Sequence, residues 1–94
     1  MESHALLDAL AALAEEEGIR VRVIPRGGAG EGVPLARSGT CRIRGELWLV
    51  LAAGEPLEDR IEAAAEALRR HAGPGLAQRW LPPAVRRRLE PEGG

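Results

Sequence analysis

Apolar residues recur with a different spacing in each part of this chain, and the spacing predicts the elements. After Ser3, a residue type favoured just before a helix, Leu6, Leu10 and Leu13 recur at helical intervals. Gly18 follows an acidic run and is typical of the position beyond a helix C-terminus. We therefore expect a first amphipathic helix between Ser3 and Gly18.

Strict alternation follows this helix. Ile19, Val21 and Val23 alternate with arginines, which predicts a half-buried strand that ends at Pro25. Residues 26–39 are rich in glycine but lack the spacing of a phosphate-binding loop, and no helix opens after them. This segment is therefore interpreted as a mobile connection and not as a nucleotide site.

Two further strands are expected at Thr40–Arg44 and Leu47–Leu51, as a β-hairpin. A two-residue turn at Gly45-Glu46 would pair Ile43 with Trp48, whereas a three-residue turn would pair Cys41 with Leu49. We prefer the three-residue turn, because it collects the apolar residues on one face. These residues are Cys41, Ile43, Leu47, Leu49 and Leu51. Trp48 and Val50 would then project away from the core.

The strongest helical signal begins at Pro56, which is well placed as the first helical residue, and ends at Gly73-Pro74. Acidic residues occupy its first turn and basic residues its last, which complements the helix dipole. Its apolar stripe consists of Ile61, Ala64, Ala65, Leu68 and Ala72. Beyond it, Leu76–Leu81 is either a helical turn or an extended arm, and Pro83 can start a short helix through Leu89.

These elements predict a single α+β domain over residues 1–90, followed by a disordered tail at 91–94. We expect a small antiparallel sheet of about three strands. Two main helices would cover one of its faces, and a short C-terminal helix would follow. The 94 residues leave room for one core, and the chain has no Phe or Tyr, so Trp48 and Trp80 supply all of its aromatic area.

The composition excludes several classes of protein. The net charge is −1, so no overall field draws the chain to nucleic acid or to a membrane. No apolar run is long enough to span a bilayer, and the N-terminus has no charged lead-in to an apolar segment. We expect a cytoplasmic protein. All thirteen basic residues are Arg, which indicates a GC-rich, bacterial genome.

Few residues are candidates for chemistry. His4, His71 and Cys41 are scattered and give no ligand spacing, so neither a metal nor a cofactor is expected. Cys41 is interpreted as a small core residue. Glu62 and Glu66 share a helix face and could act as a carboxylate pair, although Glu66 is also placed to pair with Arg70. A hydrolase using Glu62, Glu66 or Cys41 is therefore one alternative.

The basic cluster Arg86–Arg88, with Arg79 and Trp80 upstream, suggests another alternative. Arginine beside an aromatic ring can hold single-stranded nucleic acid by charge and stacking. The three arginines fan around a helix, however, and Glu90 and Glu92 follow. We favour a solvated helix, so nucleic-acid binding is not expected.

The order of three segments resembles the ImmA/IrrE-type minimal zinc peptidases. These segments are Ser38–Gly45, Leu47–Leu51 and Leu57–Ile61. The resemblance implies a helix, a strand, a hairpin and an active-site helix, which in that family bears a His-Glu-x-x-His motif two turns after an Arg-aromatic pair. Aligned on Arg60-Ile61, the motif falls on Ala65 to Arg69, and only Glu66 matches. Ala and Arg cannot replace the two His ligands, so the resemblance implies a degenerate scaffold without the peptidase zinc.

The sequence therefore predicts a non-catalytic interaction module. Its candidate interface consists of Trp48 and Val50, with Trp80 and Leu81 as a possible extension. A small core that lacks Phe and Tyr favours a homodimer, in which a second copy buries this surface. An unknown protein partner is the other possibility. Alternatively, the C-terminal segment folds back and covers Trp48 within the monomer.

Overall fold

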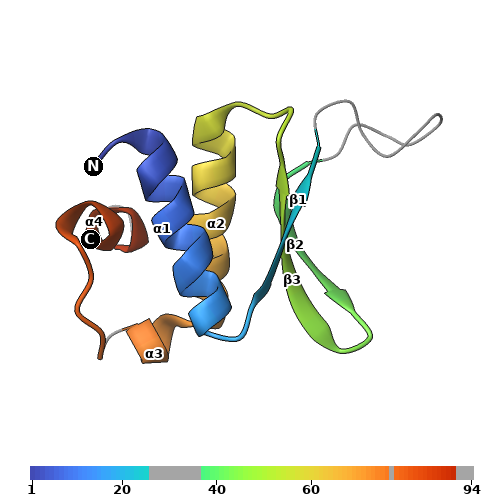
Figure 1. Ribbon diagram of the computed structural model, residues 1–94. Coiled ribbons are helices and arrows are strands. Elements are labelled where there is room, and N and C mark those ends of the chain that lie inside the picture. Colours follow the sequence, from blue (N-terminus) through green and yellow to red (C-terminus); the bar gives the residue numbers. More distant parts are fainter. Residues whose placement is uncertain (26–36, 77, 91–94) are drawn as a thin grey trace.

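The computed structural model describes residues 1–25, 37–76 and 78–90, and Figure 1 shows how they are arranged. The predicted glycine-rich connection lies largely outside these residues, and so does the predicted tail. Seven elements follow one another in the described part of the chain. They are α1 (Ser3–Glu16), β1 (Arg20–Ile24), β2 (Gly39–Ile43), β3 (Glu46–Ala52), α2 (Leu57–His71), α3 (Gly73–Leu76) and α4 (Pro83–Leu89).

The α+β class and the order of the elements are confirmed. The sheet forms one layer, α1 and α2 pack side by side against one of its faces, and α4 packs on the far side of these two helices (Figure 1). α4 begins at Pro83 and ends at Leu89, as the sequence predicted. A helical turn, α3, follows α2 and ends at Leu76. The sequence had suggested Leu76 as the first residue of the segment Leu76–Leu81, so the turn lies earlier than expected.

The sheet is mixed, which corrects the expected antiparallel arrangement. Its strand order is β1-β3-β2, with β3 antiparallel to β2 and parallel to β1. β3 is the longest and most apolar strand, and the central position buries its Leu49 and Leu51. The order of the strands along the chain predicts the local hairpin, whereas the pairing of β1 depends on packing between distant segments.

The hairpin turn differs from both turns considered from the sequence. Its two central residues are Arg44 and Gly45, with φ angles of 52° and 81°. Positive φ at both positions defines a type I′ turn, whose twist matches that of the two strands. Cys41 therefore lies opposite Trp48, and Ile43 lies opposite Glu46.

This register corrects the prediction that Cys41 and Ile43 belong to the core face. A shift of one residue moves every side chain of a strand to the other face of the sheet. Cys41 and Ile43 consequently share a face with Trp48, and both are exposed. The turn geometry thus prevails over the gathering of apolar side chains on one face.

The core lies between the sheet and the helices, and it is built from Ala, Leu, Ile and Val. The predicted stripe of α2 is buried along its whole length. Leucines of α1 pack in the same core as this stripe, and Val85 of α4 joins the core from the side away from the sheet. Since α2 contributes Ala64, Ala65 and Ala67 at the contact, helices can approach closely there.

A side chain caps the N-terminus of the first helix. Glu2, and not the expected Ser3, occupies the N-cap position of α1. Its carboxylate accepts hydrogen bonds from the backbone N–H groups of His4 and Ala5 at 3.0 and 3.1 Å. These bonds lower the pKa of Glu2, with that from His4 contributing most.

Candidate interaction surface

The face of the sheet opposite α1 and α2, which we call the outer face, is the main candidate surface. Strand alternation places Trp48 and Val50 of β3 on this face, together with Cys41 and Ile43 of β2. β1 contributes Arg20, Arg22 and Ile24, which pair in register with Trp48, Val50 and Ala52. No helix in the described part of the chain covers this face (Figure 1).

Trp48 lies at the centre of the outer face and is half-buried. The Arg20 guanidinium lies 5.6 Å from the centroid of its ring, a cation–π contact. Arg20 also forms an ion pair with Glu46. The indole Nε1 of Trp48 is buried and has no hydrogen-bond acceptor among the described residues. On the outer face, the Trp48 ring therefore lies beneath the Arg20 guanidinium, and the indole N–H has no hydrogen-bond partner among the described residues.

The structure separates the four residues of the predicted interface. Trp80 is 80% exposed, whereas Leu81 is only 9% exposed and belongs to the core. Both precede α4, which packs against α1 and α2 and not against the sheet (Figure 1). Trp80 and Leu81 consequently do not extend the surface around Trp48 and Val50. For the same reason, α4 does not cover Trp48.

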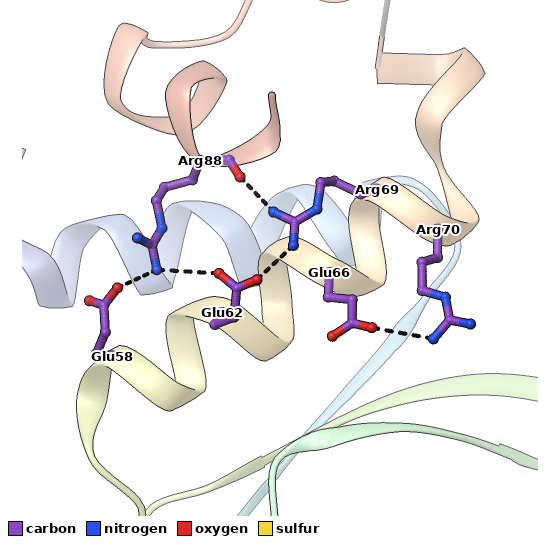
Figure 2. Close-up of polar contacts among 6 residues, drawn as sticks. All are labelled: Glu58, Glu62, Glu66, Arg69, Arg70 and Arg88. Carbon is purple, nitrogen blue, oxygen red and sulfur yellow. Dashed lines mark hydrogen bonds and ion pairs between the residues drawn. The ribbon is translucent and has the colours of Figure 1, made fainter. Parts of the chain in front are cut away.

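The candidate catalytic carboxylates of α2 face arginines (Figure 2). Glu66 pairs with Arg70 at 3.3 Å, which confirms the ion pair that the sequence suggested. Glu62 contacts Arg69 at 2.6 Å and Arg88 at 3.6 Å. Each carboxylate is thus engaged in a contact that has a structural explanation. Cys41 lies on the opposite side of the sheet from both.

The two positions aligned with the peptidase His ligands have structural roles in this fold. Ala65 is fully buried in the core. Arg69 donates a hydrogen bond to the backbone carbonyl of Arg88 at 2.7 Å, and so joins α2 to α4 (Figure 2). Among the residues that the structure describes, no group of three or more His, Cys, Asp or Glu side chains is arranged to hold a metal ion.

The arginines considered for nucleic-acid binding are partly engaged elsewhere. Arg79 contacts Glu16 at 2.6 Å and Glu17 at 2.8 Å, and the bond with Glu16 is the main cause of its raised pKa. Arg88 pairs with Glu58 at 2.5 Å. Arg79 also neutralises acidic charge at the unfavourable end of α1. The sequence alone could not identify this contact, because Arg79 lies 63 residues from Glu16 along the chain.

A groove of about 210 Å³ lies between β2 and α2, on the helix side of the sheet. Its walls are formed by Ser38, Gly39, Thr40, Ala63, Glu66, Ala67 and Arg70. The Ser38 hydroxyl accepts a hydrogen bond from the Ala52 N–H at 2.9 Å, and the Ser38 N–H donates to the Glu55 carboxylate. Hydrogen bonds with Ser38 lower the pKa of Glu55.

A larger and more apolar groove of about 530 Å³ lies beside the C-terminal helix. It is lined by Leu76, Leu81 and Leu89, and also by Arg69, Gly73, Arg86 and Glu90. Leu76 and Leu81 are core residues, so this groove lies at the edge of the hydrophobic core.

Comparison of the chain with protein-family models, curated proteins and solved structures gave no match. None of the helices in the described part of the chain is both long and apolar enough to cross a membrane.

Proposed function

We propose that this chain is a non-catalytic interaction module that binds a protein partner through the outer face of its sheet. The proposal rests on one observation: the half-buried Trp48 lies at the centre of a sheet face that no described helix covers. Half-buried aromatic rings with a polar atom and an adjoining Arg are the typical anchors of protein interfaces.

The composition of the outer face suggests the chemistry of its partner. Ile43 and Val50 provide apolar area on either side of Trp48 on this face, and Ile24 adds to it further along β1, opposite Ala52. Arg22 lies beside Val50 in the register and has no ion pair with any described residue. A partner with an apolar centre and carboxylates at its rim would complement this arrangement.

The hydrolase alternative receives less support. Glu62 and Glu66 are neutralised by arginines, and Cys41 has no His beside it in the sheet. If the resemblance to the zinc peptidases reflects ancestry, we propose that the scaffold was retained and its metal ligands were replaced by core and helix-joining residues.

The test is affinity capture from the cells of origin with three forms of the chain: wild type, Trp48→Ser and Trp80→Ser. Trp80 is the matched control, because it is more exposed but lies in the segment before α4, away from the sheet. One partner should bind the wild type and Trp80→Ser, and its affinity for Trp48→Ser should fall about 30-fold, as for a residue worth about 2 kcal/mol.

Equal capture by all three forms would contradict the proposal. So would retention that depends on Arg86 and Arg87 and falls steeply with salt, which would indicate nucleic acid. Stoichiometric zinc in the purified chain would favour the enzyme alternative.

A further inference from the structure

The two edges of the sheet differ in how well they are protected from further pairing. β1, at one edge, carries Arg20 and Arg22, and charged residues discourage edge-to-edge contact. β2, at the other edge, is a five-residue strand without Pro and with a single charged residue, Arg42, and it pairs only with β3 among the described strands. Most of β2 is exposed, and such an edge is a ready template for an additional strand.

The turn geometry shows which backbone groups of β2 point to the open edge. In a β-turn the carbonyl of the first residue accepts from the N–H of the fourth, so Ile43 and Glu46 form a hydrogen-bonded pair. Hydrogen-bonded and non-hydrogen-bonded pairs then alternate along the strands. The backbone of Cys41 therefore faces β3, and the N–H and C=O groups of Thr40 and Arg42 face outward.

We propose that β2 pairs with β2 of a second copy of this chain, antiparallel, with the two-fold axis at Cys41. Cys41 is the midpoint of the strand, so this register pairs all five residues. Thr40 then lies opposite the second copy's Arg42, and its outward N–H and C=O groups meet those of that residue. A two-fold axis at residue 42 would instead place two like charges in direct opposition, which is unfavourable.

The helix side of the same edge is complementary to itself. Glu66 and Arg70 stand on the wall of the groove beside Thr40, one turn apart on α2. We infer that the axis passes level with the midpoint of Glu66 and Arg70, so that Glu66 of each copy lies towards Arg70 of the other and the contact is reciprocal. This charge arrangement is the reason to prefer a second copy over an unrelated strand as the occupant of the edge.

The spacing of the elements also fits. α2 contacts both β2 and β3, so it lies over the boundary between these strands. With strands about 4.8 Å apart, the two copies of α2 would be separated by about 10 Å, an ordinary distance between packed helices. The dimer would have a six-stranded sheet with helices on one side, and it would present two outer faces side by side. The inference thus goes beyond the proposed function.

Sedimentation equilibrium tests the dimer directly, since the wild type should show twice the monomer mass. Thr40→Pro removes the outward N–H of an edge strand and should give a monomer with an unchanged circular dichroism spectrum. Thr40→Val keeps the N–H and should remain a dimer. A monomeric wild type at every concentration up to about 1 mM would overturn the proposal.

A charge exchange provides a second test that does not alter the strand. Arg70→Glu places like charges across the axis and should weaken the dimer by at least tenfold. The double variant Glu66→Arg, Arg70→Glu should restore it. Equal dimer affinity in all forms would contradict the proposed axis.

A disulfide between the two copies of Cys41 tests the register in which the two β2 strands pair. In a non-hydrogen-bonded antiparallel pair the two Cα atoms are about 4.5 Å apart, within the range of a disulfide. With dissolved oxygen as the oxidant and copper phenanthroline as the catalyst, the two Cys41 thiols should lose two electrons to oxygen and two protons to the buffer, and the resulting disulfide should convert the wild-type dimer to a covalent one. Trp48→Ser should crosslink equally, whereas a loss of dimer in that variant would show that the copies meet through their outer faces instead. Failure of the partner capture leaves these results unaffected, so the two proposals fail separately.

Discussion

Cys41 and Trp48 face each other across the hairpin, and both side chains lie on the sheet face that α1 and α2 leave uncovered. The large Trp side chain is mostly buried in folded proteins, and this chain has only two Trp residues. Trp48 is half-buried there and Cys41 is exposed, and this is the face through which we propose that a partner binds. The type I′ turn at Arg44-Gly45 produces the pairing of Cys41 with Trp48.

The Arg44-Gly45 turn should limit the stability of the hairpin. Arg44 is a non-glycine residue at positive φ, and Asn tolerates this conformation better. Arg44→Asn should raise the free energy of unfolding by about 0.5 kcal/mol, and Gly45→Ala should lower it by about 1 kcal/mol. Urea denaturation measures both, and equal stability of the three forms would contradict the type I′ geometry.

Arg69 should contribute more to stability than its neighbour Arg70. Arg69 bonds a backbone carbonyl of the C-terminal segment and is 29% exposed at its side chain, whereas Arg70 is 68% exposed. Arg69→Ala should cost about 2 kcal/mol and speed amide exchange in α4. Both variants are measured in the monomeric Thr40→Pro background, where the proposed dimer contact of Arg70 is absent; there Arg70→Ala is the matched control and should cost less than about 0.5 kcal/mol. Equal losses would show that the contact with α4 is unimportant.

Glu55 should make the stability depend on acid pH. Its pKa is lowered in the fold by hydrogen bonds with Ser38, so the ionised form stabilises the native state above the unfolded-state pKa. This contribution is lost as the pH falls through the folded-state pKa. Glu55→Gln should therefore be less stable than the wild type at about pH 7, and the difference should shrink by about pH 3. Thermal melts at both values measure it, and a constant difference would contradict the assignment.

Restoring the peptidase motif should not create a zinc site. The double variant Ala65→His, Arg69→His places an imidazole at a position that is fully buried among core residues. Overpacking there should cost about 1–3 kcal/mol, and the loss of the Arg69 contacts adds to that. Elemental analysis should find no stoichiometric zinc. One zinc per chain with unchanged stability would show that position 65 faces a cavity, contrary to this structure.

The local elements could be predicted from the sequence because their signals are local. The periodicity of Ile61, Ala64 and Leu68 identified α2 and its buried face, and Pro83 identified the start of α4. The side of the sheet to which Cys41 belongs could not be predicted, since a shift of one residue reverses the answer. The apolar pattern favoured one register, and the turn adopted another.

The candidate surface was only half predicted, for a related reason. Trp48 and Val50 were placed away from the core because alternation in β3 is local. Trp80 and Leu81 were grouped with them only by their apolar character, and their position depends on the packing of α4 against α1 and α2. The parallel pairing of β1 with β3 and the contact of Arg79 with Glu16 are likewise long-range.

Photo-crosslinking in the cells of origin tests whether a partner binds the outer face of the sheet, as we propose. A photoreactive amino acid would replace Val50 on the outer face or, as the control, Asp8, an exposed residue of α1. We expect one discrete adduct with a second protein from position 50 and none from position 8. Adducts from position 8 alone, or the same adducts from both positions, would contradict the proposal.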